Sequence, residues 1–307
     1  TSRLSLHDAL PIFGVFLSQG DRLVDPELSS PTREAVERAV WLAARQESNL
    51  TFFAALEVSP KTEEVLYAEE AFPTDNVEDQ ALRALNALVD KASREGIRAQ
   101  YRLAFGHPAQ EITKFVLREQ IDLVVVGTRD VGRVRGLVFG STATRLLREC
   151  PCAVWVTKPD PDWNDLNVLV ASDLGDDSRR AISAAVACAH LAEAKLHVLH
   201  ALGGSLSQKD PAATAKAAEV IRGQLAAADV HDMKYPAQVH IVDAAVEDAV
   251  QSAVKEHGID LLIMGTSRRG GISGLITGNT VDRLLPKVAC SVFVIKPDGT
   301  DSPTDAR

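Results

Sequence analysis

The sequence predicts an α/β protein made of two tandem Rossmann-like domains, each built on an open parallel sheet. A length of 307 residues suggests about two domains. Aligning residues 121–160 with residues 259–298 without gaps gives 19 identical positions in 40. A repeat of about 140 residues is far longer than a solenoid unit, so it indicates duplicated domains. In both halves, strand-length apolar runs alternate with segments of helical periodicity, which predicts βαβ crossovers.

The first half predicts five strands and four helices in alternation. Helices are expected at 31–47, 77–95, 108–119 and 141–149, because apolar residues recur there at helical spacing and Pro108 suits a first helical turn. The strands are GVFL, LTFFAAL, AQYRLAF, IDLVVVG and CAVWVT. IDLVVVG is apolar throughout, as expected for a strand buried on both faces. The second half repeats the strands as NVLVAS, LHVLHAL, QVHIV, LLIMG and CSVFVI.

These elements place the first domain at residues 13–158, the second at 166–298 and a tail at 299–307. The Pro- and Asp-rich stretch KPDPDWND is the expected linker. At the start, LSLHDALPI is the translation of the end of a common short-read sequencing adapter. Our hypothesis is therefore that residues 1–12 are an assembly artefact in place of the start of the first strand; the alternative is a genuine, poorly ordered terminus.

Composition excludes several classes of function. A net charge of −9 argues against nucleic acid as the main partner. The longest apolar runs have strand length, so no membrane association is expected. Four cysteines without CxxC spacing indicate a reduced, cytoplasmic chain. His197 and His200 alternate with apolar residues in one strand and need not share a face, and no metal site is expected there.

Ligands of open parallel sheets bind beyond the carboxyl ends of the strands, which is where the two repeated loops begin. Gly127 and Gly265 end strands, where a backbone without Cβ allows a tight turn or the close approach of a ligand. Each loop leads to a helical run, through Gly140-Ser141-Thr142 in the first half and Gly278-Asn279-Thr280 in the second. Ser141 and Asn279 suit N-cap positions. The helix N-terminus can accept an anion, although helix capping alone is the commoner use of such residues.

The chain resembles the universal stress protein family over nearly its whole length, twice. The residues that carry the resemblance are GTSRRGGISGLITGNT with VFVIKPD, and RLLRECPCAVWV. The tandem arrangement, the GNT triplet and the KPD ending resemble the E-type bacterial members. The resemblance implies an adenine nucleotide alpha hydrolase-like fold with five strands in the order 3-2-1-4-5. It also implies that the fifth strands pair, here within one chain, and it leaves a homodimer open.

ATP-binding members of that family carry the motif G-x2-G-x9-G-[ST], from which both copies depart. The first copy has Asp130 where the second Gly belongs, and that carboxylate would repel a triphosphate by about 1–4 kcal/mol at 4 Å. The second copy has Arg268 there, followed by Arg269; both could attract phosphate, but Arg268 carries a side chain where the motif has bare backbone.

The resemblance also implies an Asp after the first strand that contacts the nucleoside. Asp173 holds this place in the second half, with a turn-forming role as the alternative. In the first half the place falls at about Phe16 or Leu17, without a carboxylate. We therefore favour the second half as a nucleotide site. Its candidate residues are Asp173, Gly265, Arg268, Arg269, Gly278, Asn279 and Thr280; the weaker first-half set is Gly127, Arg129, Gly140, Ser141 and Thr142.

Two hypotheses on function remain. The favoured one is a non-enzymatic stress-response protein that senses a ligand or acts as an adaptor, with degenerate nucleotide-binding loops and no catalytic residues. The alternative is an ATP-binding protein with slow ATPase or nucleotidyl-transfer activity. ATP or another adenine nucleotide is one candidate ligand. A larger nucleotide-linked or lipid-like ligand in the second half is neither supported nor excluded by the sequence.

Overall fold

The protein divides into two compact units, each of which has its own parallel sheet. The structure is a computed structural model and describes residues 12–18, 30–56, 75–128, 139–158, 166–203, 211–266, 283–285 and 287–296. The first unit contains the described residues from 12 to 128 and from 140 to 158, and the second those from 166 to 296. The predictions for residues 1–11 and 297–307 lie outside the described residues.

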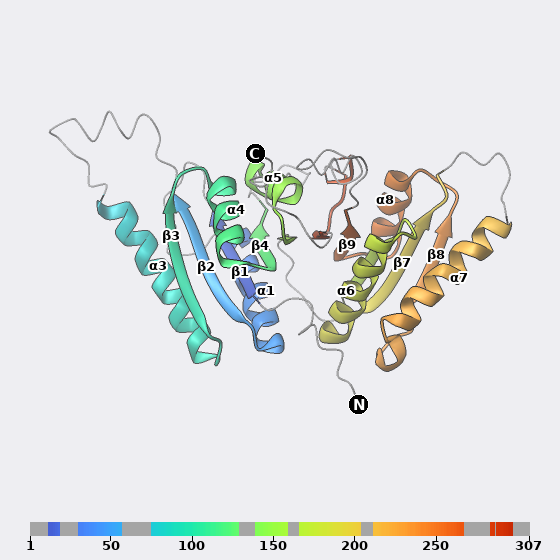
Figure 1. The fold of residues 1–307 in the computed structure, drawn as a ribbon, viewed down its shortest axis with the longest axis horizontal. Helices are drawn as coiled ribbons and strands as arrows, with labels where there is room; N and C mark the ends of the chain where they lie inside the picture. The colour runs from blue at the N-terminus through green and yellow to red at the C-terminus, as the bar shows by residue number, and fades with distance from the viewer. Residues whose placement is uncertain are drawn as a thin grey trace. The chain divides into compact units, whose positions relative to one another are not determined.

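The first unit has a five-stranded parallel sheet in the order β3-β2-β1-β4-β5 (Figure 1). The strands are β1 (Ile12–Ser18), β2 (Asn49–Leu56), β3 (Ala99–Phe105), β4 (Leu123–Gly127) and β5 (Ala153–Thr157). The helices are α1 (Ser30–Gln46), α3 (Asp75–Arg94), α4 (Pro108–Glu119) and α5 (Ser141–Glu149). Helix α1 packs on β1 and β4, α3 packs on β2 and β3, and α4 packs on β2 and α5. This is the strand order that the family resemblance implies.

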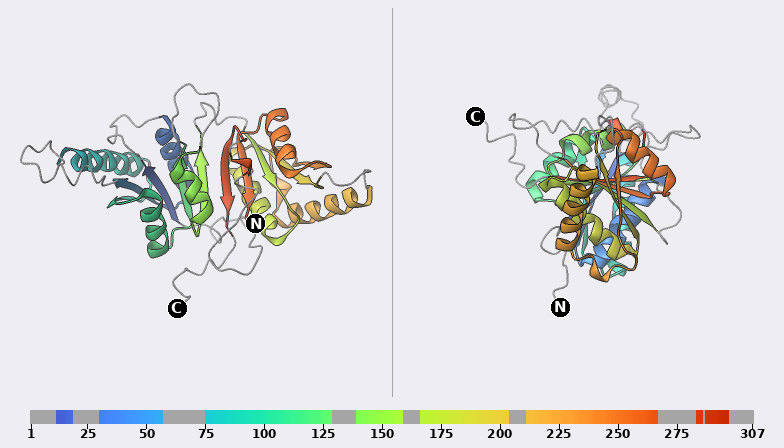
Figure 2. Two further views of the ribbon diagram at one scale, coloured as in Figure 1. Left: turned by 90° about the horizontal axis from the view of Figure 1, so that it is seen from above. Right: turned by 90° about the vertical axis from the view of Figure 1, so that its right-hand side faces the viewer.

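The second unit repeats the arrangement, with strand order β8-β7-β6-β9-β10. Its strands are β6 (Asn167–Ala171), β7 (Lys195–Ala201), β8 (Gln238–Val242), β9 (Leu261–Gly265) and β10 (Ser291–Ile295). Its helices are α6 (Asp176–Ala192), α7 (Pro211–Ala227) and α8 (Val246–Glu256), with a short 3₁₀ turn, η2 (Val230–Asp232). Figure 2 shows helices on both faces of each sheet.

The core of each unit lies on an inner strand, β4 in the first unit and β9 in the second, and on the helices that cover it. The residues of β4 from Leu123 to Val126 and those of β9 from Leu261 to Met264 are all buried. Both runs are apolar without alternation, because helices exclude water from both faces of the sheet. Edge strand β3 instead alternates between half-buried and exposed residues over most of its length. The apolar runs predicted as inner strands are therefore the inner strands.

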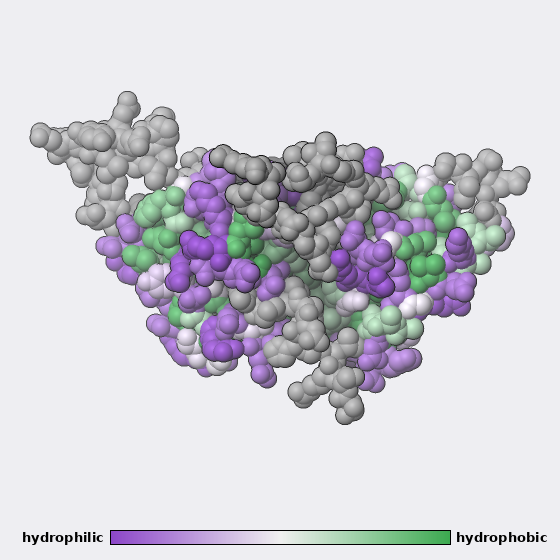
Figure 3. Space-filling view, viewed as in Figure 1, coloured by the Kyte–Doolittle hydropathy of each residue, from purple (hydrophilic) through white to green (hydrophobic). Residues whose placement is uncertain are grey.

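Hydrophilic residues predominate on the coloured part of the face in Figure 3, with smaller hydrophobic areas between them. Polar cover of this kind is normal for a surface in contact with water. Among the described helices, none combines the length and the apolarity needed to cross a bilayer. The pairing of the two fifth strands, β5 and β10, stays a prediction.

Candidate functional site

The carboxyl edge of the second sheet has its topological switch point between β6 and β9. Strand β6 pairs with β7 on one side and with β9 on the other, so successive crossovers run in opposite directions from it. Ala171 at the end of β6 pairs with Met264, the residue before Gly265. Asp173 and Gly265 therefore follow neighbouring strand ends, at the kind of crevice in which open α/β sheets bind ligands.

Asp173 is exposed and organises the turn between β6 and α6. Its Oδ1 accepts hydrogen bonds from the Ser178 hydroxyl at 2.5 Å and from the Gly175 N–H at 2.9 Å. Its own N–H donates to Ser178 Oγ at 2.8 Å, and the turn passes through Leu174 at φ 68°. The turn-forming role expected as the alternative is thus present. The same contacts fix the carboxylate at the switch point.

The backbone beside this turn is tied to β7. The Ser172 N–H donates to the Leu199 carbonyl at 2.9 Å, and His200 Nδ1 hydrogen-bonds the Ser172 carbonyl at 2.8 Å. The Leu174 N–H donates to Ser172 Oγ at 3.1 Å. His200 therefore supports the Asp173 turn and does not contact the partners of His197, so the two histidines of β7 have different partners.

Gly265 has a structural reason to lack a side chain. A Cβ at this position would lie 2.8 Å from the Asp177 carbonyl oxygen and 3.1 Å from its carbonyl carbon, both backbone atoms of the first turn of α6. The sequence left open whether Gly265 allows a tight turn or the close approach of a ligand. In the structure the bare backbone accommodates α6. The loop after Gly265 begins with Thr266, whose N–H donates to the Ile295 carbonyl at 3.1 Å.

The other second-half candidates, Arg268, Arg269, Gly278, Asn279 and Thr280, lie outside the described residues. The described chain resumes at Arg283, whose Nε lies 2.7 Å from Glu247 Oε1 on the first turn of α8. Leu284 and Leu285 follow and are buried, which anchors the far end of the loop on the second unit.

In the first unit, Gly140 and not Ser141 occupies the N-cap of α5, so the expectation of a Ser141 cap is wrong. Gly140 is extended at φ −61° and ψ 159°, its carbonyl accepts the Thr144 N–H at 3.0 Å, and no side chain caps the helix. Ser141 is the first helical residue and is exposed, followed by Thr142. Glycine is among the residues preferred at N-cap positions. The first turn also carries no acidic residue.

At the end of β4, the Thr128 N–H donates to the Thr157 carbonyl at 3.1 Å, as Thr266 does in the second unit. Gly127 ends the strand as expected. Arg129 and Asp130, which the sequence places in this loop, lie outside the described residues. The start of the loop is thus the same in both units.

Strand register corrects the equivalent of Asp173 in the first unit. Phe16 pairs with Val126, just as Ala171 pairs with Met264, and Val126 and Met264 each precede the strand-final glycine. Counting on two residues from Phe16 gives Ser18, and not Phe16 or Leu17. A carboxylate is absent from this place too, because a serine holds it.

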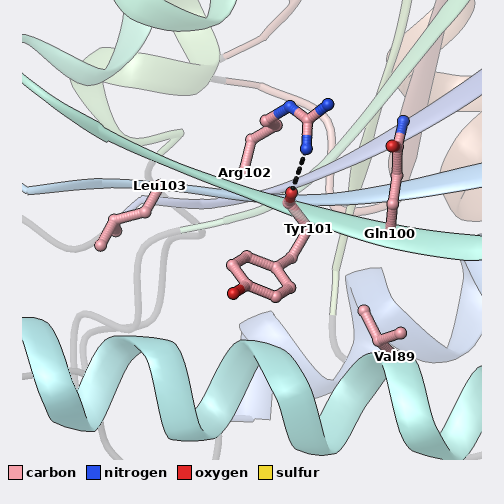
Figure 4. Close-up of a pocket in the computed structure, with 5 residues that line it drawn as sticks. All are labelled: Val89, Gln100, Tyr101, Arg102 and Leu103. Atoms are coloured by element: carbon pink, nitrogen blue, oxygen red, sulfur yellow. Dashed lines mark hydrogen bonds between the residues drawn. The ribbon is translucent and has the colours of Figure 1, made fainter.

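A shallow depression of about 530 Å³ lies on the first unit, away from β4 (Figure 4). Val89 of α3 and residues 100–103 of edge strand β3 line it, and Arg102 Nη1 donates to the Tyr101 carbonyl at 2.9 Å. Arg102 directs its guanidinium back to its own strand and Leu103 points away from Tyr101 in this view. The depression therefore does not coincide with the candidate site.

The sequence did not reveal a cluster of three histidines in the second unit, and the expectation of no metal site there stays a prediction. The candidate ligand nitrogens of His197, His240 and His257 lie within 4.8 Å of one another. These residues are up to 60 positions apart in the chain, so no local spacing announces them. Only the register of β7 against β8 could have indicated that His197 and His240 lie close together.

Comparison with known proteins agrees with this architecture. The universal stress protein family matches the chain at residues 23–158 and again at residues 166–296. Universal stress protein E of Photorhabdus laumondii is 24% identical over 311 residues, covering 92% of this chain and 96% of that protein. The universal stress protein E homolog of Haemophilus influenzae is 26% identical over 301 residues, covering 89% and 96%.

Among solved structures, a universal stress protein from Archaeoglobus fulgidus superposes with a TM-score of 0.67 at 18% identity, covering 92% of this chain and 98% of that one. At this identity the likeness shows a shared fold. The two family matches cover most of the sequence, one on each compact unit. The chain therefore belongs to the universal stress protein family and carries two tandem domains of that family.

Proposed function

We propose that this chain is a cytoplasmic stress-response protein that senses a ligand or acts as an adaptor without catalysing a reaction, and that its second unit binds an adenine nucleotide weakly. The observation that carries the proposal is Asp173. Its carboxylate is exposed at the switch point and is held there by Ser178 and the Gly175 N–H. A fixed carboxylate at this place suits the hydroxyl groups of a ribose.

The phosphates would extend from Asp173 towards the loop that starts at Thr266. Arg268 and Arg269 would supply positive charge, and Gly278, Asn279 and Thr280 would supply N–H donors before the last strand. Arg268 stands where the family motif has glycine, and a side chain there would hinder the close approach of phosphate to the backbone. The affinity is therefore expected to be modest, which suits a sensor better than a tightly occupied enzyme.

Gly265 adds a second argument for weak binding. Its backbone is covered by the first turn of α6, because the Asp177 carbonyl oxygen lies 2.8 Å from the position that a Cβ would take. Asp177 and Asp176 are both in that turn. A phosphate near this turn would meet their negative charge, so nucleotide binding relies on the arginines that follow Thr266.

Calorimetric titration of the full chain with ATP tests the proposal. Asp173→Asn keeps an oxygen for the Gly175 N–H and Ser178 but removes the charge, so it should weaken binding about 10- to 100-fold, as expected for a lost charge-assisted hydrogen bond of ~1.5–3 kcal/mol. Asp176→Asn is the matched control, since its side chain is 90% exposed and lies in the same turn. It should bind ATP as tightly as the unsubstituted chain, or slightly more tightly.

Three outcomes contradict parts of the proposal. Binding that survives Asp173→Asn but disappears in Ser141→Ala would place the nucleotide in the first unit. Absence of heat in every variant would refute nucleotide binding and leave the loops as helix caps. Phosphate release from ATP by the unsubstituted chain, lost in Asp173→Asn, would support the enzymatic alternative.

A further inference from the structure

Three histidines converge at the amino edge of the second sheet, opposite the Asp173 turn. His197 lies near the start of β7, His240 lies in β8, and His257 is the C-cap of α8. His197 Nδ1 and His240 Nε2 are 3.0 Å apart. The ring centroid of His257 lies 4.8 Å from that of His197 and 4.6 Å from that of His240. Within the described part of the chain, these three histidines form the one group of at least three His, Cys, Asp or Glu residues whose ligand atoms converge.

The convergence follows from strand register and from the end of a helix. His197 pairs with Gln238, so His240 lies two residues further along β8 on the same face of the sheet. Helix α8 packs on β7, and its C-terminal end brings His257 to that face. The His257 N–H donates to the Ala253 carbonyl at 3.0 Å, and Gly258 at φ 58° then turns the chain away. Each imidazole is thus carried by a fixed piece of backbone.

The geometry of the cluster suits a metal ion. Each imidazole carries two ring nitrogens, and the candidate ligand nitrogens of the three residues lie within 4.8 Å of one another. The ring centroid of His197 lies 5.3 Å from that of His240 and 4.8 Å from that of His257, with both pairs of rings stacked. A neutral imidazole nitrogen is a common metal ligand, so three imidazoles at this spacing could share one ion.

We propose that His197, His240 and His257 form a three-imidazole site for a divalent transition metal, with Zn²⁺ as the best match. Three histidines and one solvent molecule are a common ligand set for Zn²⁺. His240 and His257 are half-buried, so water can supply the fourth ligand, while His197 closes the site from inside. No oxygen ligand takes part, which disfavours Mg²⁺ and Ca²⁺.

The geometry requires only side-chain movement. Tetrahedral Zn²⁺ with Zn–N distances of about 2.0–2.1 Å places its ligand nitrogens about 3.3–3.4 Å apart. The pair His197–His240 is at 3.0 Å, and the widest separation in the cluster is 4.8 Å. Closing this gap requires the ligand nitrogens to move by about 1.5 Å, a shift on the scale of a side-chain rotation. Lys195 opposes a cation, so the affinity is expected to be below that of a site with a carboxylate ligand.

Such an ion would join β7, β8 and α8, the outer elements of the second unit. The site lies at the amino edge of the sheet, whereas the proposed nucleotide site lies at the carboxyl edge. The inference therefore does not depend on the proposed function. The ion would have a structural role. It would stabilise the folded unit because it binds the folded chain and not the unfolded one.

Titration of the chelator-treated full chain with ZnCl₂ tests the inference, with Co²⁺ as a spectroscopic probe. We expect one Zn²⁺ per chain and visible Co²⁺ bands of tetrahedral intensity. His240→Gln and His257→Gln should each weaken Zn²⁺ binding at least tenfold and abolish those bands. His231→Gln is the matched control, because it removes an exposed histidine of the same unit outside the cluster.

Circular dichroism verifies that each variant is folded, and the two substituted residues are half-buried, so folding should persist. If Zn²⁺ binds equally tightly to all variants, the ion is elsewhere and the inference is wrong. If the unsubstituted chain gives no tetrahedral Co²⁺ spectrum, the three imidazoles do not bind a metal together and the inference is also wrong.

Discussion

Replacing Gly265 by alanine should destabilise the second unit by about 1–3 kcal/mol, the usual cost of forcing extra atoms into a packed core. The added Cβ would be 2.8 Å from the Asp177 carbonyl oxygen, closer than real Cβ contacts, and 3.1 Å from the carbonyl carbon. Both atoms belong to the backbone of α6, so no side-chain rotation relieves the overlap. Either α6 or β9 must shift, and β9 is held between β6 and β10.

Gly223→Ala is the matched control. Gly223 lies inside α7 and is exposed, and a Cβ added there would have no heavy atom within 4 Å outside its own helical neighbours. Alanine there should stabilise the helix by about 0.8–1.0 kcal/mol, because glycine is a poor helix former. The same chemical change is thus expected to have opposite signs at two sites of one unit.

Urea unfolding followed by pulsed hydrogen exchange, read on peptides from α6 and β9, measures both effects in the full chain. The sequence contains no tryptophan between residues 166 and 296, so tryptophan fluorescence serves separately as a reporter for the rest of the protein. If Gly265→Ala is as stable as the unsubstituted chain, the packing argument is refuted. If Gly265→Ala keeps its stability but loses ATP affinity, the bare backbone at Gly265 serves a ligand and not the contact with α6.

One further prediction concerns the pH dependence of the second unit, and another tests the strand pairing that the family resemblance implies. The pKa of His197, lowered from 6.5 to about 4, means that protonation favours the unfolded chain, so stability is lost as pH falls below 6.5. Between pH 7 and pH 5 the metal-free second unit should lose about 2 kcal/mol, measured by urea unfolding, and His197→Gln should remove most of this dependence. If β5 and β10 pair within the chain, hydrogen exchange should protect successive amides of both strands; protection of alternate amides, as at a sheet edge, would contradict the pairing.

Helix and strand positions could be predicted because they depend on local patterns. Helix α4 has the expected bounds of 108–119, since a proline at the first turn marks its start. Strand β4 follows from an unbroken apolar run. Two domains follow from the internal repeat. Each of these signals lies in a short window of sequence or in a comparison of the sequence with itself.

Strand register and cap geometry could not be predicted in the same way. Gly140-Ser141 contains two residues that can cap a helix, and only backbone dihedral angles decide between them. The equivalence of Ser18 with Asp173 depends on how β1 pairs with β4, and a shift of two residues leaves the same side chains on the same face. Apolar patterning therefore leaves the register of short parallel strands unresolved.

The histidine cluster shows the same limit at a functional level. From the sequence, His197 and His200 look like one pair in one strand. In the structure, His197 contacts His240 from the next strand, while His200 hydrogen-bonds the Ser172 carbonyl beside the Asp173 turn.

Strand β7 therefore carries one end of each proposed site, the metal cluster at its amino end and the nucleotide turn towards its carboxyl end. Any coupling between a metal and a nucleotide would have to pass through this strand, and by linkage it would act equally in both directions. Since β7 is paired on both sides and buried over most of its length, it offers little freedom to transmit a change, and the two sites are expected to be nearly independent.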